Sequence, residues 1–208
     1  MNLLDHIVLA AGDLECACKD FERTTGITPV YGGKHANQLS HNALVSIGQD
    51  LYLEIFAPLP GISDGHHWIR ACHTFRAPRV LSFCLRALTT LEDAVNVCKK
   101  AGISGMGPAE WSRKTTSGDE LTWRLFYPED TKYEIALPFF IDWLDSTHPS
   151  KTSPGGIKLM SIDIKTPHKN AVVNLYNEFG FQPSSVTDGD DTKLCMTLKT
   201  PNGIITYS

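Results

Sequence analysis

Two glutamates and one histidine stand inside apolar stretches of strand length, where charged or polar side chains are uncommon. Glu54 and Glu134 each open the same pattern, Glu-Ile-x-x-Pro, which covers residues 54–58 and again residues 134–138. His6 lies in an apolar stretch near the start of the sequence. A buried carboxylate without a partner is costly, so each glutamate needs a cation, a cluster of hydrogen-bond donors or a proton. These three side chains are the first candidates for chemistry, with a hydrogen-bonded core histidine as the alternative for His6.

The glutamate pattern closes two of three similar modules. Signals in the order strand, helix, strands recur over about residues 1–60, 78–143 and, in a shorter form, 156–208. A module that cannot bury its own apolar face must pair with its neighbour, and the crease between paired modules is a natural ligand site. We therefore expect an α+β fold and a single unit over residues 1–208, in which repeated β-α-β-β-β modules pair into a curved, cup-like sheet and the third module covers an edge.

Local patterns place the elements of these modules. The expected strands are residues 3–9, 27–33, 42–47, 51–57, 80–87, 121–127, 132–137, 159–165, 192–199 and 203–207, and residues 103–111 are expected to be irregular or a strand. Helices are expected to begin near Asp13, Thr90 and His168 and to stop at Gly26, Gly102 and Gly180. Strand alternation places His6 on one face with Leu4 and Val8, and Glu54 on one face with Tyr52 and Phe56. When the first two helix starts are aligned, Phe83 stands at the position of His6.

The composition disfavours several classes of partner. A chain of 208 residues that is 42% hydrophobic and 20% charged can bury a sizeable core without disulfides or a structural metal. With 19 basic against 23 acidic side chains it offers no basic stripe for nucleic acid, and no apolar run approaches the length that spans a membrane. Six scattered cysteines and the lack of a basic leader predict reduced thiols and a cytoplasmic protein.

Five short motifs, taken in order, resemble the glyoxalase-like domains of the vicinal-oxygen-chelate superfamily. They are Leu4-Asp5-His6-Ile7-Val8, His41-Asn42-Ala43-Leu44, Tyr52-Leu53-Glu54-Ile55, the stretch from Ser112-Arg113 through Gly118 to Leu121-Thr122-Trp123, and the stretch from Leu137-Pro138 to Trp143. The resemblance covers nearly the whole chain. It implies paired modules curled into a cup, with a divalent ion often held by the first and last strands of two modules. Activities in the superfamily include lyase, isomerase, epimerase, dioxygenase and thiol-transferase chemistry, beside metal-free binding proteins, so fold alone does not decide function.

The resemblance implies a metal site made of His6, Glu54 and Glu134. His6 and Glu54 match the ligand positions of the first module, and Glu134 matches the closing strand of the second. One imidazole and two carboxylates suit Zn, Mn, Fe, Mg or Ni better than a metal that prefers thiolates. Phe83 stands where a further ligand is common, so water, His41 or substrate completes the shell, or no metal binds.

Other side chains are expected to move protons or bind the substrate. Glu134 is the expected catalytic proton shuttle, and His41 is a candidate general base or further ligand, with a structural role at the strand edge as the alternative. Arg113 is expected to clamp a carboxylate or phosphate, with a surface salt bridge as the alternative. The expected walls of the cup are Tyr52, Phe56, Phe83 and Trp123.

Two functions stay open. One is a metal-dependent enzyme that acts on a small oxygenated substrate, acidic or of dicarbonyl type, by lyase or isomerase proton transfer or by dioxygenase chemistry. The other is a metal-free protein that binds a small molecule in the same cup. The segments 58–78 and 145–156 are predicted linkers, and the histidines of residues 66–73 lack the one-turn spacing of a zinc site. The partner in either case is a small molecule, and a homodimer is left open.

Overall fold

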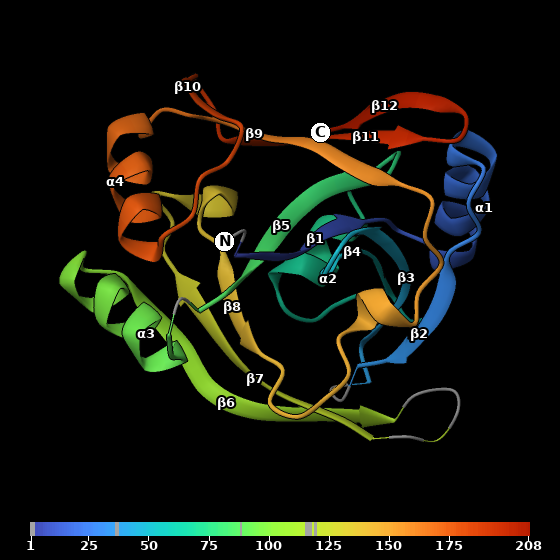
Figure 1. Cartoon of the computed structure of the whole chain (residues 1–208), viewed down its shortest axis with the longest axis horizontal. Coiled ribbons are helices and arrows are strands. Elements are labelled where there is room, and N and C mark those ends of the chain that lie inside the picture. Colours follow the sequence, from blue (N-terminus) through green and yellow to red (C-terminus); the bar gives the residue numbers. More distant parts are fainter. Residues whose placement is uncertain (1–2, 36–37, 88, 115–117, 119) are drawn as a thin grey trace.

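The computed structural model describes residues 3–35, 38–87, 89–114, 118 and 120–208, which form two β-sheets (Figure 1). The larger sheet contains β1 (Leu4–Ala10), β2 (Val30–Lys34), β3 (Ser40–Gly48), β4 (Leu51–Pro58), β5 (Arg79–Arg86), β6 (Ser104–Lys114), β7 (Glu120–Glu129) and β8 (Phe139–Asp142). The smaller sheet contains β9 (Lys158–Thr166), β10 (Ser185–Asp188), β11 (Lys193–Thr200) and β12 (Gly203–Tyr207). The helices are α1 (Leu14–Thr25), α2 (His67–Cys72), α3 (Leu91–Lys100) and α4 (Lys169–Phe179), with 3-10 turns η1 (Glu134–Ala136) and η2 (Pro149–Lys151).

The order of strands shows how the first two modules pair. The larger sheet runs β2-β3-β4-β1-β5-β8-β7-β6, and the smaller runs β10-β9-β11-β12. β1 and β5, the first strands of the two modules, pair antiparallel at the centre, and each has its module's closing strand parallel on its other side. The large sheet curls, and the smaller sheet lies along one side of it, across from β6 and β7 (Figure 1). The predicted α+β fold of paired β-α-β-β-β modules is confirmed; that residues 1–208 act as one unit stays a prediction.

The helix ends predicted from the sequence are capped in the structure, where side chains bind backbone groups that lack a partner within the helix. The Asp13 carboxylate accepts a hydrogen bond from the Cys16 amide, 2.8 Å away, and so caps α1. Gly26, in the left-handed conformation, ends the same helix. Thr90 and Asp93 form a capping box that starts α3. These local contacts set α1 and α3 at corresponding places in the two modules.

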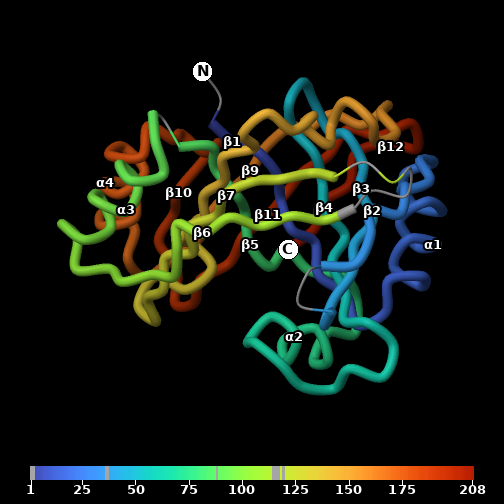
Figure 2. The backbone as a smooth tube through the Cα atoms, turned by 90° about the horizontal axis from the view of Figure 1, so that it is seen from below, coloured from blue at the N-terminus to red at the C-terminus, as the bar shows by residue number. Residues whose placement is uncertain are grey.

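The large sheet has an outer and an inner face with different neighbours. The outer face packs against α1, α3 and the third module and includes Ile7, Leu9 and Leu85. The inner face carries the side chains of Val8, Phe56, Cys84 and Ile141, together with partly buried tryptophans. The segment between β4 and β5, which contains α2, packs on the inner face and projects at one end of the sheet (Figure 2). The inner face therefore has the aromatic character of a binding surface.

The expectation that Phe83 lines the cup is wrong. Across β1 and β5, His6 lies opposite Cys84 and Ile7 lies opposite Phe83. Phe83 thus points to the outer face, where its ring packs against Tyr176 and Phe181 at centroid distances of 6.1 and 5.4 Å. Aligning the helix starts fails because the chain from this strand to its helix is one residue shorter in the second module. A shift of one residue turns every side chain of a strand to the other face.

The expected strand over residues 132–137 is also wrong. Residues 134–136 form η1, and the closing strand begins only at Phe139. The Asp130 carboxylate accepts hydrogen bonds from the amides of Lys132 and Tyr133, at 2.7 and 3.3 Å, and turns the chain there. Glu134 is exposed and has a φ of 50°. The two Glu-Ile-x-x-Pro copies therefore occupy different structures.

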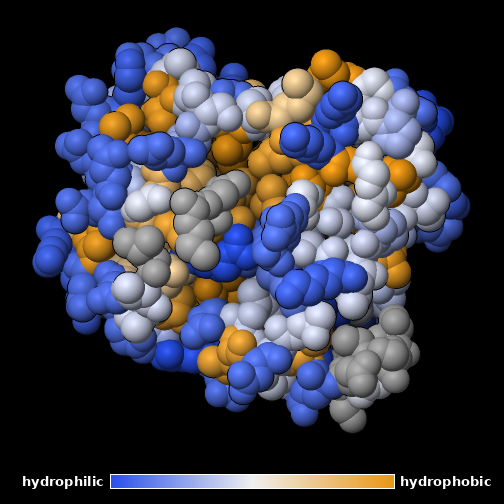
Figure 3. Space-filling model, viewed as in Figure 1, coloured by the Kyte–Doolittle hydropathy of each residue, from blue (hydrophilic) through white to orange (hydrophobic). Residues whose placement is uncertain are grey.

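The face seen in Figure 3 is mostly hydrophilic, and apolar side chains show in the recesses between polar ones. Within the described residues, no helix has both the length and the apolar character that a membrane crossing requires.

Candidate functional site

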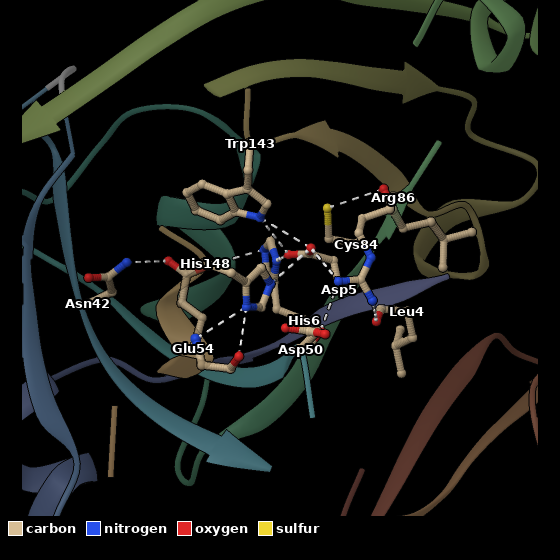
Figure 4. A network of polar contacts seen from close by, with 12 residues as sticks. Leu4, Asp5, His6, Asn42, Asp50, Glu54, Cys84, Arg86, Trp143 and His148 are labelled. Carbon is tan, nitrogen blue, oxygen red and sulfur yellow. Dashed lines mark hydrogen bonds and ion pairs between the residues drawn. The ribbon is translucent and has the colours of Figure 1, made fainter. Parts of the chain in front are cut away.

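A network of polar side chains occupies the inner face beside the pairing of β1 with β4 (Figure 4). Asp5, His6 and Glu54 are buried at 0%, 3% and 7% exposure. Asn42 reaches the network from β3, and Trp143 and His148 reach it from the segment that follows β8. Carboxylate and imidazole groups this deep in an apolar sheet are stable only when hydrogen-bonding or charged neighbours surround them.

A β-bulge explains why two neighbouring residues share one face. Side chains alternate along a strand, so Asp5 and His6 should point in opposite directions. The pairing of β1 with β5 shifts between Leu4 and His6, which leaves Asp5 as an extra residue in β1. Asp5 consequently contacts the His6 ring. The sequence offered a charged residue in an apolar strand but no signal for the bulge, so Asp5 was missed.

Asp5 is the anchor of the network. Its Oδ1 lies 2.7 Å from His6 Nδ1 and its Oδ2 lies 3.1 Å from His148 Nε2. The Trp143 indole N–H donates to both oxygens, at 3.3 and 3.2 Å, and Arg86 Nη1 lies 3.8 Å from Oδ2. Burial by itself disfavours the ionised form, but hydrogen bonds with His148 and His6 outweigh it and lower the pKa of Asp5 below its ordinary value. Asp5 is therefore a buried, fully engaged anion.

Glu54 is the second anion, held mainly on one oxygen. Oε1 accepts a hydrogen bond from Asn42 Nδ2 at 2.8 Å and lies 3.2 Å from His35 Nε2. Oε2 lies 3.7 Å from His6 Nε2, beyond hydrogen-bond distance. Burial opposes ionisation of Glu54, yet the hydrogen bond and charge of His35, with smaller contributions from His6 and Asn42, lower its pKa to about 2. Gly32 allows this packing, since a Cβ there would lie 2.2 Å from Asn42 Oδ1.

The His6 ring lies between the two anions. It stacks on Tyr52 with a centroid distance of 4.5 Å and meets the edge of Phe139 at 5.2 Å. These contacts fix the ring with Nδ1 toward Asp5 and Nε2 toward Glu54. A histidine whose remote nitrogen is held by a carboxylate is suited either to proton transfer or to metal binding through the other nitrogen.

Three of the expected wall residues lie on the inner face. Tyr52 is buried beneath His6, and Phe56 stacks on His35 at 5.6 Å. Trp123 is half-buried on β7, opposite Trp111, which pairs with it on β6. The result is an aromatic surface beside the polar network. That these residues bind a substrate stays a prediction.

Two expected catalytic residues are not brought to the network. Glu134 is exposed on η1, so it does not join the buried pair of His6 and Glu54, and the predicted metal trio is not assembled. His41 neighbours Asn42 on β3 and points the opposite way, with its ring 6.0 Å from that of Tyr31. Sequence reasoning missed His35 and His148, because both lie in loops and are positioned by distant segments.

Arg113 lines a cavity that is also lined by Thr147 and Pro149, the chain neighbours of His148. The cavity has a volume of about 580 Å³ and opens between β2 and β6, the two edges of the large sheet, under residues 145–153. Arg113 is the one cationic side chain among its lining residues, which also include Glu120 and Asp145. Burial raises the pKa of Tyr52 and the nearby Arg113 charge opposes that rise. The Arg113 charge is therefore felt at the Tyr52 ring that stacks on His6.

The donor atoms of His6 and Glu54 suit a divalent metal, whereas the group of Asp5, His6 and Cys84 does not. Ligand atoms of Asp5, His6 and Cys84 lie within 4.8 Å of one another. Burial raises the pKa of the Cys84 thiol well above its ordinary value, however, and both Asp5 oxygens already accept hydrogen bonds. At the positions that correspond to Tyr52 and Glu54, the second module carries Phe139 and Ile141, which cannot coordinate. The donors that suit a divalent ion are His6 Nε2 and the Glu54 carboxylate.

Comparisons with known proteins agree with this architecture. A hypothetical protein from Staphylococcus aureus is 15% identical and superimposes with a TM-score of 0.68, over 99% of this chain and 98% of that one. A methylmalonyl-CoA epimerase from Streptomyces coelicolor is 16% identical with a TM-score of 0.52, over 70% of this chain and 97% of that one. No curated protein matches the sequence. The family model of the glyoxalase-like domain matches residues 4–180. With its paired modules, the chain therefore belongs to the glyoxalase-like domain family of the vicinal-oxygen-chelate superfamily.

Proposed function

We propose that the protein is an enzyme that removes or relocates a proton on a small, acidic, oxygenated substrate, as lyases and isomerases do. The observation that supports it is the pair of Glu54 and His6, which face each other across 3.7 Å on an aromatic inner face. A protein that needed only a stable core would place apolar side chains there, because two buried anions add no net stability over well-packed residues.

Glu54 Oε2 is the proposed proton acceptor. Oε1 is anchored by Asn42 and His35, whereas Oε2 accepts no hydrogen bond from any described residue. The low pKa of Glu54 depends first on the hydrogen bond and charge of His35, and to a smaller extent on the charge of His6 and the hydrogen bond of Asn42. When these imidazoles are neutral, burial is the dominant influence, and burial makes a carboxylate a stronger base. The base strength of Glu54 is thus set by its two histidine neighbours.

The cavity beside Arg113 is the proposed binding place for the acidic group of the substrate. A guanidinium binds a carboxylate or phosphate through two parallel hydrogen bonds, which fixes orientation as well as charge. Arg113 forms no salt bridge with any residue that the structure describes. The structural neighbour from Streptomyces coelicolor binds 2-nitronate-propionyl-CoA, an acyl-CoA ligand, so CoA thioesters of small acids belong among the substrates to test.

The fold family also implies a divalent metal, and His6 with Glu54 would hold it. A bound ion would supply positive charge that polarises a substrate oxygen. The tight stacking of His6 on Tyr52 and its hydrogen bond to Asp5 orient the ligand nitrogen in either case.

Solvent exchange tests the proposal. Purified protein is incubated in D2O with a panel of small 2-hydroxy acids, 2-oxo acids, dicarboxylates and their CoA thioesters, with and without Mg, Mn, Zn or Co, and carbon-bound hydrogen is followed by NMR. We expect exchange with at least one acidic compound and a loss of about 100-fold or more in Glu54→Gln, because general bases contribute on the order of 100-fold or more. Glu134→Gln, an exposed glutamate outside the network, is the matched control. Exchange that survives Glu54→Gln, or that depends on Glu134, would refute the assignment.

A metal-free binding protein is the second candidate. The apolar residues Phe139 and Ile141 favour it, because they occupy places where the second module could have supplied ligands. Binding of a panel compound without exchange, with unchanged affinity in the metal-free protein, is the result expected for this function.

A further inference from the structure

Tyr127, on β7, presents a phenol on the inner face of the large sheet. Its side chain packs with the inner-face cluster, on the same side of the strand as Leu125 and Trp123. The ring stacks on Phe139 with a centroid distance of 5.0 Å and an interplanar angle of 16°. Phe139 in turn meets the His6 ring at 5.2 Å. Phe139 therefore contacts both the Tyr127 ring and the imidazole of the polar network.

The Tyr127 ring is fixed, but its hydroxyl is unpaired. Trp68, from α2, meets the edge of the Tyr127 ring at 6.2 Å and also contacts Phe139 at 5.7 Å, so the three rings hold one another. The hydroxyl makes no hydrogen bond with any residue that the structure describes. Among the described residues, only Asn42 Oδ1 is a fully enclosed side-chain atom without a partner. The Tyr127 hydroxyl is therefore open to a ligand on the inner face.

Tyr127 is close enough to Glu54 for the two groups to interact. Burial raises the pKa of Tyr127 well above its ordinary value, and negative charge at Cys84 and Glu54 raises it further. The phenol consequently stays protonated and can donate a hydrogen bond, but it cannot act as a base. Glu54 Oε2 accepts no hydrogen bond from the described residues. An unpaired acceptor on β4 and an unpaired donor on β7 thus share the inner face, with β1, β5 and β8 between their strands.

We propose that Tyr127 is a second catalytic residue, which donates a hydrogen bond to the substrate oxygen that becomes negative when Glu54 removes a proton from the neighbouring carbon. This inference rests on the proposed function and narrows its substrate class to acids that carry a ketone or thioester carbonyl beside that carbon. As Glu54 Oε2 takes the proton, the electron pair of the C–H bond forms a C=C bond and the carbonyl π pair moves onto oxygen. Return of a proton from Glu54 to carbon restores the carbonyl. A neutral donor in a shielded site stabilises such a charge strongly.

Solvent exchange in Tyr127→Phe is the first test, with the carbonyl compounds of the same panel. We expect kcat to fall about 100-fold or more with KM unchanged, because the hydrogen bond strengthens only as charge develops on oxygen. The melting temperature should equal that of wild type, since the ring remains and the hydroxyl binds no described residue. Tyr133→Phe is the matched control: it removes the same atom from a buried tyrosine of the outer-face cluster and should leave exchange unchanged.

A binding measurement tests the donor without turnover. The nitronate form of 3-nitropropionate carries a flat oxyanion beside carbon, as an enolate does, whereas propionate carries only the carboxylate. Calorimetric titration of wild type should show tighter binding of the nitronate. Tyr127→Phe should weaken nitronate binding about tenfold or more, because a hydrogen bond to a charged group is lost, and should leave propionate binding unchanged.

The outcomes separate this inference from the proposed function. Exchange that requires Glu54 but proceeds at the wild-type rate in Tyr127→Phe overturns the role of Tyr127 and leaves the proposed function intact. A raised KM with unchanged kcat, or equal nitronate affinity in wild type and Tyr127→Phe, also overturns it. Absence of exchange in wild type contradicts the proposed function, whereas weaker nitronate binding by Tyr127→Phe would then still support Tyr127 as the donor to an oxyanion.

Discussion

Replacement of Phe83 by alanine tests which face of β5 the ring occupies. Phe83 is 0% exposed and lies where the large sheet meets the third module, against Tyr176 and Phe181. Removing a phenyl ring from such a core costs about 3–5 kcal/mol of unfolding free energy, because apolar contacts are lost and a cavity remains. In a chain of this size each kcal/mol lowers the melting temperature by about 2–4 °C. We therefore expect a decrease of roughly 6–20 °C.

Urea denaturation measures the loss of unfolding free energy, and thermal melting measures the decrease in melting temperature. Two further variants serve as comparisons. Trp123→Ala, which removes a half-buried ring from the inner face, should destabilise less than Phe83→Ala does. The double variant Phe83→Ala with Phe181→Ala should show a coupling energy of about 0.5–3 kcal/mol, because the two rings touch. A melting temperature within about 2 °C of wild type, or additive effects in the double variant, would refute the assigned register of β1 and β5.

Arg113→Lys should weaken binding of malonate or inorganic phosphate about tenfold while changing stability by less than about 0.5 kcal/mol, because lysine keeps the charge but not the two-pronged geometry. Calorimetric titration beside a melting curve decides this, and equal affinities would return Arg113 to a structural role. Glu54 has a pKa lowered from 4.5 to about 2, so its ionised form stabilises the folded state above pH 4.5 and this contribution is lost as the pH falls toward 2. The stability difference between wild type and Glu54→Gln should therefore shrink over that interval, and a difference independent of pH would contradict the assignment.

Much of the architecture could be predicted because its signals are local. Apolar runs of strand length mark β1 and β4, a side-chain cap begins α1 at Asp13, and a glycine at position 26 ends it. These features act over a few residues and do not depend on the rest of the chain. The repeated order of strand and helix then indicated paired modules, because each module needs a partner to bury its apolar face.

Predictions that depended on register or on local turns failed. Phe83 was misplaced by one residue, which reverses the face of a strand. Glu134 was placed in a strand because its sequence repeats that of Glu54, whereas hydrogen bonds to Asp130 turn the chain at that point. A repeated pattern of five residues therefore predicts the local backbone structure less reliably than the hydrogen bonds that neighbouring residues can form.

The amino-acid sequence by itself determined the repeated modules, the glyoxalase-like resemblance and two members of the network, His6 and Glu54. Only the tertiary structure determined the rest of the network. Asp5 reaches it through a bulge in the pairing of β1 with β5, and His35 and His148 arrive from segments that look like loops in the sequence. The physical reason is distance along the chain: His148 lies 143 residues from the carboxylate that it contacts, and no local pattern encodes such a contact.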